Sequence, residues 1–558
     1  MRQTDLSGLA DSFLRGIGYP NFLGASFCDH RIVETHISVV IIGRELVLKF
    51  KKPILLDFLD YSTLKKRWQA ACNEVALNRR LSDGVYLGLW PILAINKEFS
   101  ETDVVTTDVS DSTPAGLLEV AVVMRTLAMD SMLSEIIRGD RLSIDLHIDP
   151  LAKKLASFHR LEMSKKREVV RVFGRATIDI ISKESCDNIK SLEAENSKQL
   201  LSTGAKGALE RVKTYADSFL GASSAEEKFA KRDRLGYVVD GHGDLRTEHI
   251  SFRAGSVNII DCIEFSESLR MVDVLSDIAF LCMDLDFLQR SDVAVEFLNR
   301  YKRYFGRDCE LSLFTFYSVY RAMVRAKVEI LKYIQVVNGA ASNLSDCLAF
   351  EAKNCLARAE RYLALASRYV LEIRRPFLIA TAGVMGVGKS TLANYIGAMS
   401  GAQVLASDKV RKELFPPALD DKSLPFRSGK YSESATEATY KAIFKCAERC
   451  LFYGNPVVLD AAFSQKRYRK DLRELARKYQ VPGLIANCSL DYDKLRDRLK
   501  MRETDSRSLS DGRVELLDKH IESFEPLDSN EGLVVVEVDT EASLESQFGR
   551  VLSALKDT

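Results

Sequence analysis

One short segment constrains the local fold more tightly than any other part of this chain. Gly383-Val-Met-Gly-Val-Gly-Lys-Ser390 fits the pattern GxxxxGK[ST], with an apolar run before it and an amphipathic stretch after it. The pattern predicts a strand, a glycine loop and a helix, which is the start of a βαβ unit. Backbone N–H groups of such a loop curve around phosphate oxygens, and the helix adds the positive end of its dipole. The segment therefore predicts an α/β P-loop domain with a parallel sheet that binds a nucleotide.

The polar positions of this loop have distinct expected roles. Lys389 is expected to reach the β- and γ-phosphates, and the Ser390 hydroxyl is expected to hold Mg²⁺. ATP and Mg²⁺ are therefore the expected cofactors. The remaining candidates for nucleotide binding are the loop glycines and the residue after the serine: Gly383, Gly386, Gly388 and Thr391.

Two further carboxylates follow apolar runs of this region. Asp460 ends the run NPVVLDAAF, where a Mg²⁺ ligand or an acid/base group is expected; the alternative is a cap for the next helix. Asp408 follows the run VLAS, with Arg411 one helical turn later, and is a candidate to receive an acceptor hydroxyl. An ordinary helix N-cap at this point explains Asp408 nearly as well.

An arginine-rich segment, 495–512, is a candidate lid. Arg498 and Arg502 are four residues apart, so they share one face of a helix. In a small kinase such a segment closes over the phosphates and supplies cations where charge spreads in the transition state. The alternative is a solvated basic face.

Residues 376–558 resemble the small P-loop kinases, a group that includes gluconate and shikimate kinases, polynucleotide 5′-kinases, zeta-type toxins and related AAA-type domains. The resemblance implies phosphate transfer from ATP to a hydroxyl group. It also implies that Asp408 holds or deprotonates the acceptor hydroxyl, that Lys389 is catalytic, and that Arg498 and Arg502 belong to the lid. The acceptor itself is not written in these motifs.

The N-terminal region has an α+β pattern. Two apolar runs in 34–50 flank Gly43-Arg44, which predicts a hairpin, and the charged stretch 62–81 predicts a helix. Residues 121–123 predict a further buried strand, leading into a helix over 132–137. Strands and a helix first, with mostly helices later, are typical of an α+β fold.

The stretch from about 270 to 370 predicts mostly helices, because apolar residues recur there at three- and four-residue spacing. Thr, Asp and Ser residues in 100–116 predict a surface loop. Strand-forming residues begin again after Pro376, so we place the boundary near 370–376. This gives domains at 1–370 and 376–558.

A second candidate site lies in the segment GHGDLRTEHI at 241–250. Phosphate transfer needs a carboxylate to orient the attacking hydroxyl and ligands for the Mg²⁺ of ATP. Asp244 is the candidate for the first role, and Asp261, at the end of a predicted strand, for the second. Lys49 on the hairpin and Glu74 on the following helix are candidates to clamp the α- and β-phosphates. Each signal alone is weak, and their order along the chain makes the joint match more specific.

This order of residues resembles the aminoglycoside phosphotransferase-like branch of the protein-kinase-like fold, across roughly 30–365. The resemblance implies a structural role for Asp277. The stretches ETHISVVII, LDFLDYSTLKKR and YRAMVRAKV are similar to a bacterial family that fuses such a domain to a P-loop kinase. Its members are often named bifunctional aminoglycoside phosphotransferase/ATP-binding protein.

Two positions depart from the phosphotransferase pattern. His249 stands where the loop has a metal-binding Asn, and we keep it as a candidate metal ligand, although Mg²⁺ prefers oxygen. Arg246 stands where His is frequent and adds positive charge beside Asp244. No GxGxxG precedes them, and His242 is expected to hold the loop by hydrogen bonds. The sequence therefore leaves open whether this half transfers phosphate.

Composition excludes some classes of function. The formal net charge is +1, so no global field attracts nucleic acid or an anionic membrane, and this weakens a 5′-end kinase reading of Lys466, Arg467, Arg469 and Lys470. Eleven dispersed cysteines give no zinc or disulfide signature. No apolar run suggests a signal peptide or a membrane span, so a cytoplasmic location is expected.

Two classes of function remain. The first is an ATP-dependent phosphotransferase for a small-molecule hydroxyl, in which the N-terminal half is a second kinase or a substrate-recognition unit. The second is a nucleotide-gated regulatory protein with an N-terminal pseudokinase platform. Aminoglycosides are doubtful acceptors, because a fold resemblance does not establish a substrate.

Overall fold

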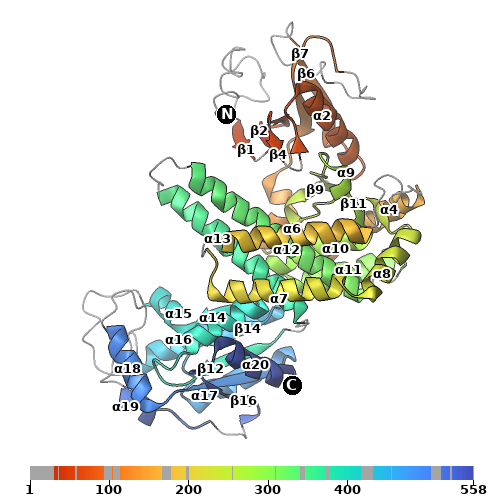
Figure 1. Ribbon diagram of the computed structural model, residues 1–558. Helices are drawn as coiled ribbons and strands as arrows, with labels where there is room; N and C mark the ends of the chain where they lie inside the picture. The colour runs from red at the N-terminus through yellow and green to blue at the C-terminus, as the bar shows by residue number, and fades with distance from the viewer. Residues whose placement is uncertain are drawn as a thin grey trace. The chain divides into compact units, whose positions relative to one another are not determined.

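The computed structural model (Figure 1) divides the chain into two compact units. The first unit comprises 1–180, 223–284 and 295–314, and the second comprises 181–222, 285–294 and 315–558. The second unit thus includes helices that precede residue 370, and the predicted domain boundary stays a prediction. The residues that the structure describes are 30–35, 37–56, 59–93, 104, 113–165, 177–196, 200–253, 255–307, 310–339, 346–371, 376–415, 432–453, 455–503, 517–527 and 531–556.

The first unit contains a five-stranded antiparallel sheet in the order β1-β2-β3-β7-β6. Helix α2 (Leu64–Asn78), capped by the Thr63 side chain, lies in the chain between β3 and β6 and packs against β6 and β7. The predicted hairpin is confirmed, because Ile42 pairs with Val47 across the turn at Gly43. The strands are β1 (Arg31–Glu34), β2 (Ser38–Ile42), β3 (Leu46–Lys51), β6 (Tyr86–Leu93) and β7 (Leu117–Arg125), with a small separate pair, β4 (Leu55–Leu56) and β5 (Leu59–Asp60).

Alternation along the strands gives this sheet two buried faces. Val122 of β7 lies in a cluster with Trp68 and Val75 of α2, whereas its neighbour Val123 lies in a different cluster with Trp90. Successive strand residues point to opposite faces, so one strand serves both clusters. The face that is covered by α2 is the one that matters for the site, because it carries the helix on which Glu74 lies.

The rest of the first unit is mainly helical, as predicted, with two short antiparallel pairs, β8 with β11 and β9 with β10. The loop 241–249 connects β8 to β9. The strands are β8 (Val238–Asp240), β9 (Ile250–Arg253), β10 (Ser256–Ile259) and β11 (Met271–Asp273). The helices are α3 (Leu133–Arg138), α4 (Asp149–Ser164), α8 (Ser223–Arg234) and α9 (Glu267–Arg270), together with most of α10 (Val274–Phe287) and α11 (Ser291–Phe305) and the short helical turns η3 (Met129–Ser131), η4 (Ile144–Ile148) and η5 (Thr247–His249).

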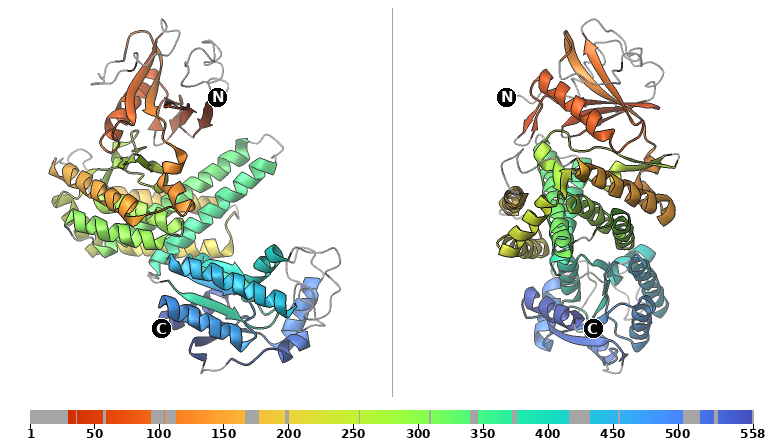
Figure 2. Two further views of the ribbon diagram at one scale, coloured as in Figure 1. Left: turned by 180° about the vertical axis from the view of Figure 1, so that it is seen from behind. Right: turned by 90° about the vertical axis from the view of Figure 1, so that its right-hand side faces the viewer.

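The second unit combines long helices with a five-stranded parallel sheet in the order β13-β14-β12-β15-β16. Helices lie on both faces of this sheet (Figure 2). The strands are β12 (Leu378–Ala382), β13 (Gln403–Ala406), β14 (Val457–Asp460), β15 (Gly483–Ser489) and β16 (Val534–Asp539). The helices are α6 (Thr177–Asn196), α7 (Thr203–Leu220), α12 (Leu311–Gly339), α13 (Asp346–Val370), α14 (Lys389–Ser400), α15 (Ser407–Leu414), α16 (Glu433–Phe452), α17 (Lys466–Tyr479), α18 (Tyr492–Glu503), α19 (Leu517–Glu522) and α20 (Leu544–Lys556).

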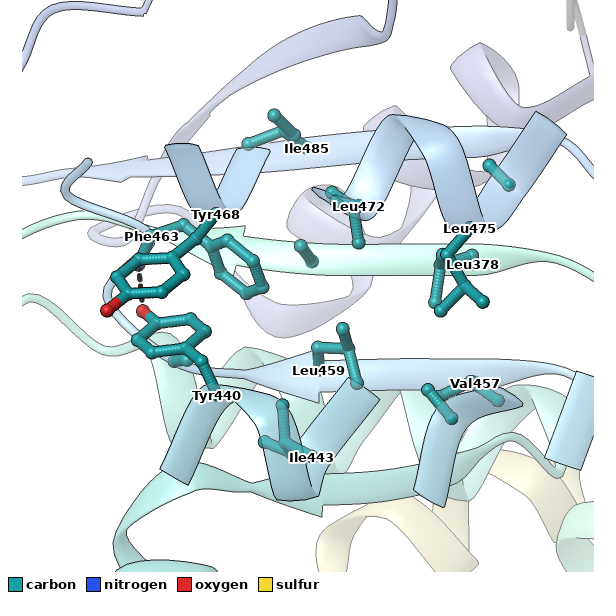
Figure 3. Packing of buried hydrophobic residues seen from close by; sticks show 14 of the residues in the cluster. Leu378, Tyr440, Ile443, Val457, Leu459, Phe463, Tyr468, Leu472, Leu475 and Ile485 are labelled. Carbon is teal, nitrogen blue, oxygen red and sulfur yellow. Dashed lines mark hydrogen bonds between the residues drawn. The ribbon is translucent and has the colours of Figure 1, made fainter. Parts of the chain in front are cut away.

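The core of the parallel sheet lies beneath α16 and α17 (Figure 3). Tyr440 of α16 stacks on Tyr468 of α17 with ring centroids 3.7 Å apart. The Tyr440 hydroxyl accepts a hydrogen bond of 3.0 Å from the backbone N–H of Phe463, which has a positive φ of 44°. These contacts fix the backbone that follows Asp460, close to the carboxyl end of β14.

No helix within the described ranges is both long enough and apolar enough to cross a membrane. The expected cytoplasmic location stays a prediction. The predicted loop at 100–116 falls almost entirely outside the described residues, which include only Val104 and the stretch from 113 onward.

Candidate active sites

The glycine loop connects β12 to α14 and takes a backbone path that only glycine accommodates. Gly383, Gly386 and Gly388 have φ values of 129°, 78° and 110°. A Cβ atom on Gly383 would lie 2.6 Å from the carbonyl oxygen of Cys488. The positive φ values and the close approach of neighbouring atoms explain why these positions are glycine. The loop has the form expected of a phosphate cradle at the N-terminus of a helix.

The candidate lid helix packs directly on this loop. A Cβ atom on Gly386 would lie 2.8 Å from Cδ2 of Leu499 and 3.1 Å from Cδ1 of Leu495, and both leucines belong to α18. Arg498, next to Leu499, is half-buried on the same helix. Arg502 belongs to α18, but its side chain and the segment 504–512 lie outside the described residues.

The polar side chains of the loop lie among partners typical of a P-loop. The Lys389 ammonium donates a hydrogen bond of 2.7 Å to the carbonyl oxygen of Val384. The Ser390 hydroxyl faces the Asp460 carboxylate closely enough to lower its pKa. Asp460 lies opposite Thr381 in the pairing of β14 with β12, with a separation of 3.5 Å between Thr381 Oγ1 and Asp460 Oδ1. The pair Ser390 and Asp460 therefore offers oxygen ligands of the kind that Mg²⁺ prefers.

Burial raises the pKa of the Asp460 carboxyl above its ordinary value. The Ser390 hydroxyl and the charge of Lys389 act in the opposite direction, whereas the charge of Asp408 adds to the rise. Asp460 does not cap the next helix, because α17 begins at Lys466 and Gln465 is its N-cap. The helix-cap interpretation of Asp460 was therefore wrong.

Asp408 lies in the first turn of α15, at the same sheet edge as Asp460. Ala406, two residues earlier, pairs with Asp460 across the strands β13 and β14. Ala406 is also the N-cap of α15, and no side chain caps this helix, so Asp408 is not an N-cap. Its carboxylate is 56% exposed and accepts a hydrogen bond of 3.2 Å from the buried Arg411. Asp408 is thus not a helix cap, and its side chain is exposed apart from the pair with Arg411.

The predicted clamp of the N-terminal half is assembled in the structure. Lys49 Nζ lies 2.8 Å from Glu74 Oε1 and 2.7 Å from Asp261 Oδ1. Lys51 shares this face of β3, two residues along, and lies 2.6 Å from the other Glu74 oxygen. Lys51 also pairs with Glu264. The sequence interpretation missed Lys51 and Glu264, although the two-residue spacing from Lys49 was a signal for the first of them.

These charges change the pKa values of the acidic groups. Burial works to raise the pKa of Asp261, but Lys49 and then His249 outweigh it and hold that pKa well below its ordinary value. Burial also opposes ionisation of Glu74, and Lys49 and Lys51 together keep its pKa low. Asp261 has a positive φ of 63°, a strained backbone conformation of the kind that clusters at functional sites.

Asp277 fixes the loop 241–249 through hydrogen bonds to its backbone. The carboxylate of Asp277 accepts hydrogen bonds from the backbone N–H groups of His242 (2.7 Å) and Gly243 (2.9 Å). The imidazole of His242 contacts the carbonyl oxygen of Ile260 at 2.9 Å. Burial lowers the pKa of His242 to about 4. Both residues therefore hold the loop, in accordance with the structural roles expected for them.

Asp244 and His249 both contact Arg246. The two carboxylate oxygens of Asp244 each accept a hydrogen bond of 3.1 Å from the Arg246 guanidinium. His249 Nε2 lies 3.2 Å from Arg246 Nη2 and 3.7 Å from Asp261 Oδ2. Sequence reasoning identified Arg246 as an extra charge but not as a bidentate partner of Asp244. Among the described residues, no group of three or more His, Cys, Asp or Glu side chains is arranged to hold a metal ion.

The type of each sheet and the residues on its strands and adjoining helices define the class of each unit. The first sheet has the lysine on its third strand and the partner glutamate on the following helix, which is the protein-kinase-like arrangement. The second is a parallel sheet with a P-loop between its first strand and first helix. The predicted fold class is confirmed in both halves. A family model described as AAA domain also matches residues 378–527, which confirms the AAA-type P-loop domain.

The chain is 30% identical over 477 residues to proteins of Mycobacterium tuberculosis and Mycobacterium bovis that are named only as uncharacterized proteins. The match covers 84% of this chain and 85% of each relative. The chain belongs to the family that these mycobacterial proteins represent.

Solved structures of kinases are similar to separate parts of the chain. A gluconokinase from Sinorhizobium meliloti covers 33% of this chain and 94% of its own, at 22% identity and a TM-score of 0.23. A choline/ethanolamine kinase family protein from Mesorhizobium loti covers 64% of this chain and 99% of its own, at 14% identity and a TM-score of 0.32. A choline kinase from Cryptosporidium parvum covers 64% and 95%, at 9% identity and a TM-score of 0.36.

Proposed function

We propose that the P-loop half is an ATP-dependent kinase that phosphorylates a hydroxyl group of a small molecule. The observation that carries this proposal is the gathering of Lys389, Ser390, Asp460 and Asp408 at one edge of the parallel sheet. Ligands of open α/β sheets bind at the carboxyl ends of the strands, near a switch in strand order. A helix N-terminus, a cation and two carboxylates meet at such an edge here.

Each of these residues has a role in the proposed reaction. Lys389 binds the β- and γ-phosphates of ATP, and Ser390 with Asp460 holds Mg²⁺, which offsets phosphate charge when it is bound. Asp408 orients the acceptor hydroxyl and takes its proton as the acceptor oxygen bonds to the γ-phosphorus and the bond from that phosphorus to ADP breaks. Arg498, on a helix that contacts the loop, stabilises charge on the transferred group, and Arg502 is the second lid candidate.

The test is ATP turnover with a panel of sugars, sugar acids, polyols and amino alcohols. Asp408→Asn is expected to lower acceptor-dependent kcat by about 10²–10⁴ while ATP affinity stays unchanged. Glu413→Gln is the matched control, because Glu413 is an exposed carboxylate at the other end of the same helix. Equal turnover in both variants would remove Asp408 from the mechanism, and no turnover with any acceptor would favour a regulatory ATP switch.

The N-terminal half is proposed to bind a nucleotide of its own, as a second kinase or as a recognition unit for the substrate. Lys49 and Glu74 support nucleotide binding, because they form the kind of ion pair that positions phosphates in the protein-kinase-like fold. Asp261 lies beside Lys49, and an aspartate near this lysine holds Mg²⁺ in that fold. One observation favours the regulatory alternative for this half: both oxygens of Asp244, the candidate base, are engaged by Arg246.

A further inference from the structure

A buried arginine occupies the catalytic loop of the N-terminal half. Arg246 is 7% exposed, and its guanidinium donates to both oxygens of Asp244 and also pairs with Glu248. In protein kinases, two Mg²⁺ ions lie beside the base, and the loop asparagine with the later aspartate holds them. Here the asparagine position is His249, and the side chain that faces it is Arg246.

The hydrogen bonds of His249 fix which ring nitrogen carries the proton. Nδ1 lies 2.8 Å from the carbonyl oxygen of Asp244, and a carbonyl only accepts, so Nδ1 is the protonated nitrogen. Arg246 Nη2 lies 3.2 Å from Nε2 and has only N–H donors, so the guanidinium occupies the place from which a metal ion would bind Nε2. A nitrogen used in this way is not open to a metal ion.

The two predicted metal ligands therefore differ in fit. Asp261 has one oxygen near Lys49 and the other 3.7 Å from His249 Nε2, and its carboxylate is 45% exposed. It fits a Mg²⁺ ion that arrives with nucleotide. His249, and the Asp244 carboxylate beside it, do not fit a second ion, because a fixed cation already satisfies both.

We propose that Arg246 takes the place of the second metal ion in the N-terminal site, and that His249 is a positioning residue for Arg246. This site binds a nucleoside triphosphate with one divalent ion, held through Asp261. The fixed guanidinium supplies the second positive charge beside Asp244. The inference rests on the nucleotide binding that is proposed for the N-terminal half and is independent of phosphate transfer by the P-loop half.

Counting bound Mn²⁺ by electron paramagnetic resonance tests this directly. The parent is full-length protein with Lys389→Ala, which removes nucleotide from the P-loop; the same protein with Asp261→Asn added gives the background. We expect one Mn²⁺ per bound ATP above that background. Two Mn²⁺ ions per ATP would overturn the proposal. Absence of ATP binding would also overturn it, while leaving the P-loop kinase proposal intact.

Two variants assign the effect to the arginine. Arg246→Gln with His249→Asn restores an open loop ligand and removes the fixed cation, so the count is expected to rise to two. His249→Asn alone keeps the pair between Arg246 and Asp244, and the count is expected to stay at one. A count of one in the double variant would show that Arg246 is not what excludes the second ion. The parent count decides the main point even if the double variant does not fold.

Discussion

Burial decides the charge state of the histidine that precedes the loop aspartate. His242 is fully buried, and burial lowers its pKa from 6.5 to about 4. The unfolded chain therefore binds a proton at a pH where the folded chain does not. Above pH 6.5 the imidazole is neutral in both states and has no effect on the pH dependence. As the pH falls from 6.5 toward 4, protonation of the unfolded chain lowers the free energy of unfolding.

We expect the free energy of unfolding of the first unit to fall by about 3 kcal/mol between pH 7 and pH 4 on account of His242. Urea unfolding followed by tryptophan fluorescence measures this unit alone, because the two tryptophans of the chain are Trp68 and Trp90. In His242→Gln, the unfolding free energy is expected to depend less steeply on pH in this window, by an amount that corresponds to one proton fewer taken up on unfolding. The same slope in both proteins would contradict the assignment.

Gly383 provides a second prediction at this scale. Its φ of 129° and the carbonyl oxygen of Cys488, 2.6 Å from an added Cβ, leave no place for a side chain. Gly383→Ala is expected to weaken ATP binding more than tenfold in calorimetry, because the loop must move. Gly549→Ala is the control, since nothing lies within 4 Å of its Cβ position in α20, and it is expected to leave affinity unchanged. Unchanged affinity in both variants would contradict the strain argument.

Helix α17 shows how neighbouring residues of one element differ in role. Arg469 is buried and donates to the carbonyl oxygens of Phe463 (2.8 Å) and Pro526 (3.0 Å) and to both oxygens of Glu531. Lys470, the next residue, is 65% exposed. The basic cluster that was considered for nucleic-acid binding thus includes an arginine with a structural role. Arg469 connects α17 to the segment before it, at Phe463, and to the segment after it, at Pro526 and Glu531.

Arg469→Met is expected to destabilise the second unit by about 3–5 kcal/mol, because it breaks the ion pair of a fully buried guanidinium and leaves the carbonyl oxygens of Phe463 and Pro526 without this donor. Lys470→Met, the same change one residue later, is expected to stay within about 0.5 kcal/mol of the parent. Chemical unfolding followed by circular dichroism measures both. Equal effects would show that Arg469 is a surface charge like its neighbour.

Elements with strong local patterns could be predicted from the sequence. The hairpin at Gly43, the glycine loop at 383–390 and the aspartates at strand ends all lie where periodicity and turn chemistry place them. The contacts of Arg246 with Asp244 and His249 could not be predicted, because they depend on side-chain burial within the folded loop. The inclusion of 315–371 in the second unit depends on helix packing, which no linear pattern records.

At the scale of the whole molecule, a nucleotide site is proposed in each unit. Tryptophan fluorescence reports on the first unit alone, because both tryptophans lie there. In Lys389→Ala, saturating Mg-ATP is expected to raise the tryptophan-detected stability of the first unit, by about 2.7 kcal/mol at a concentration of 100 times Kd. Adding Asp261→Asn is expected to abolish this rise. A rise that survives Asp261→Asn would show that nucleotide acts on the first unit from elsewhere.

The contact between Leu499 and Gly386 links two events that are normally considered separately. The loop that is proposed to bind the phosphates and the helix that carries Arg498 meet through the leucine side chain and a glycine. In the proposed kinase, we expect product release to require that this contact loosens, so the size of residue 499 is expected to influence the rate of nucleotide exchange. A smaller residue at 499 is expected to speed exchange and to shorten the time for which the nucleotide stays bound.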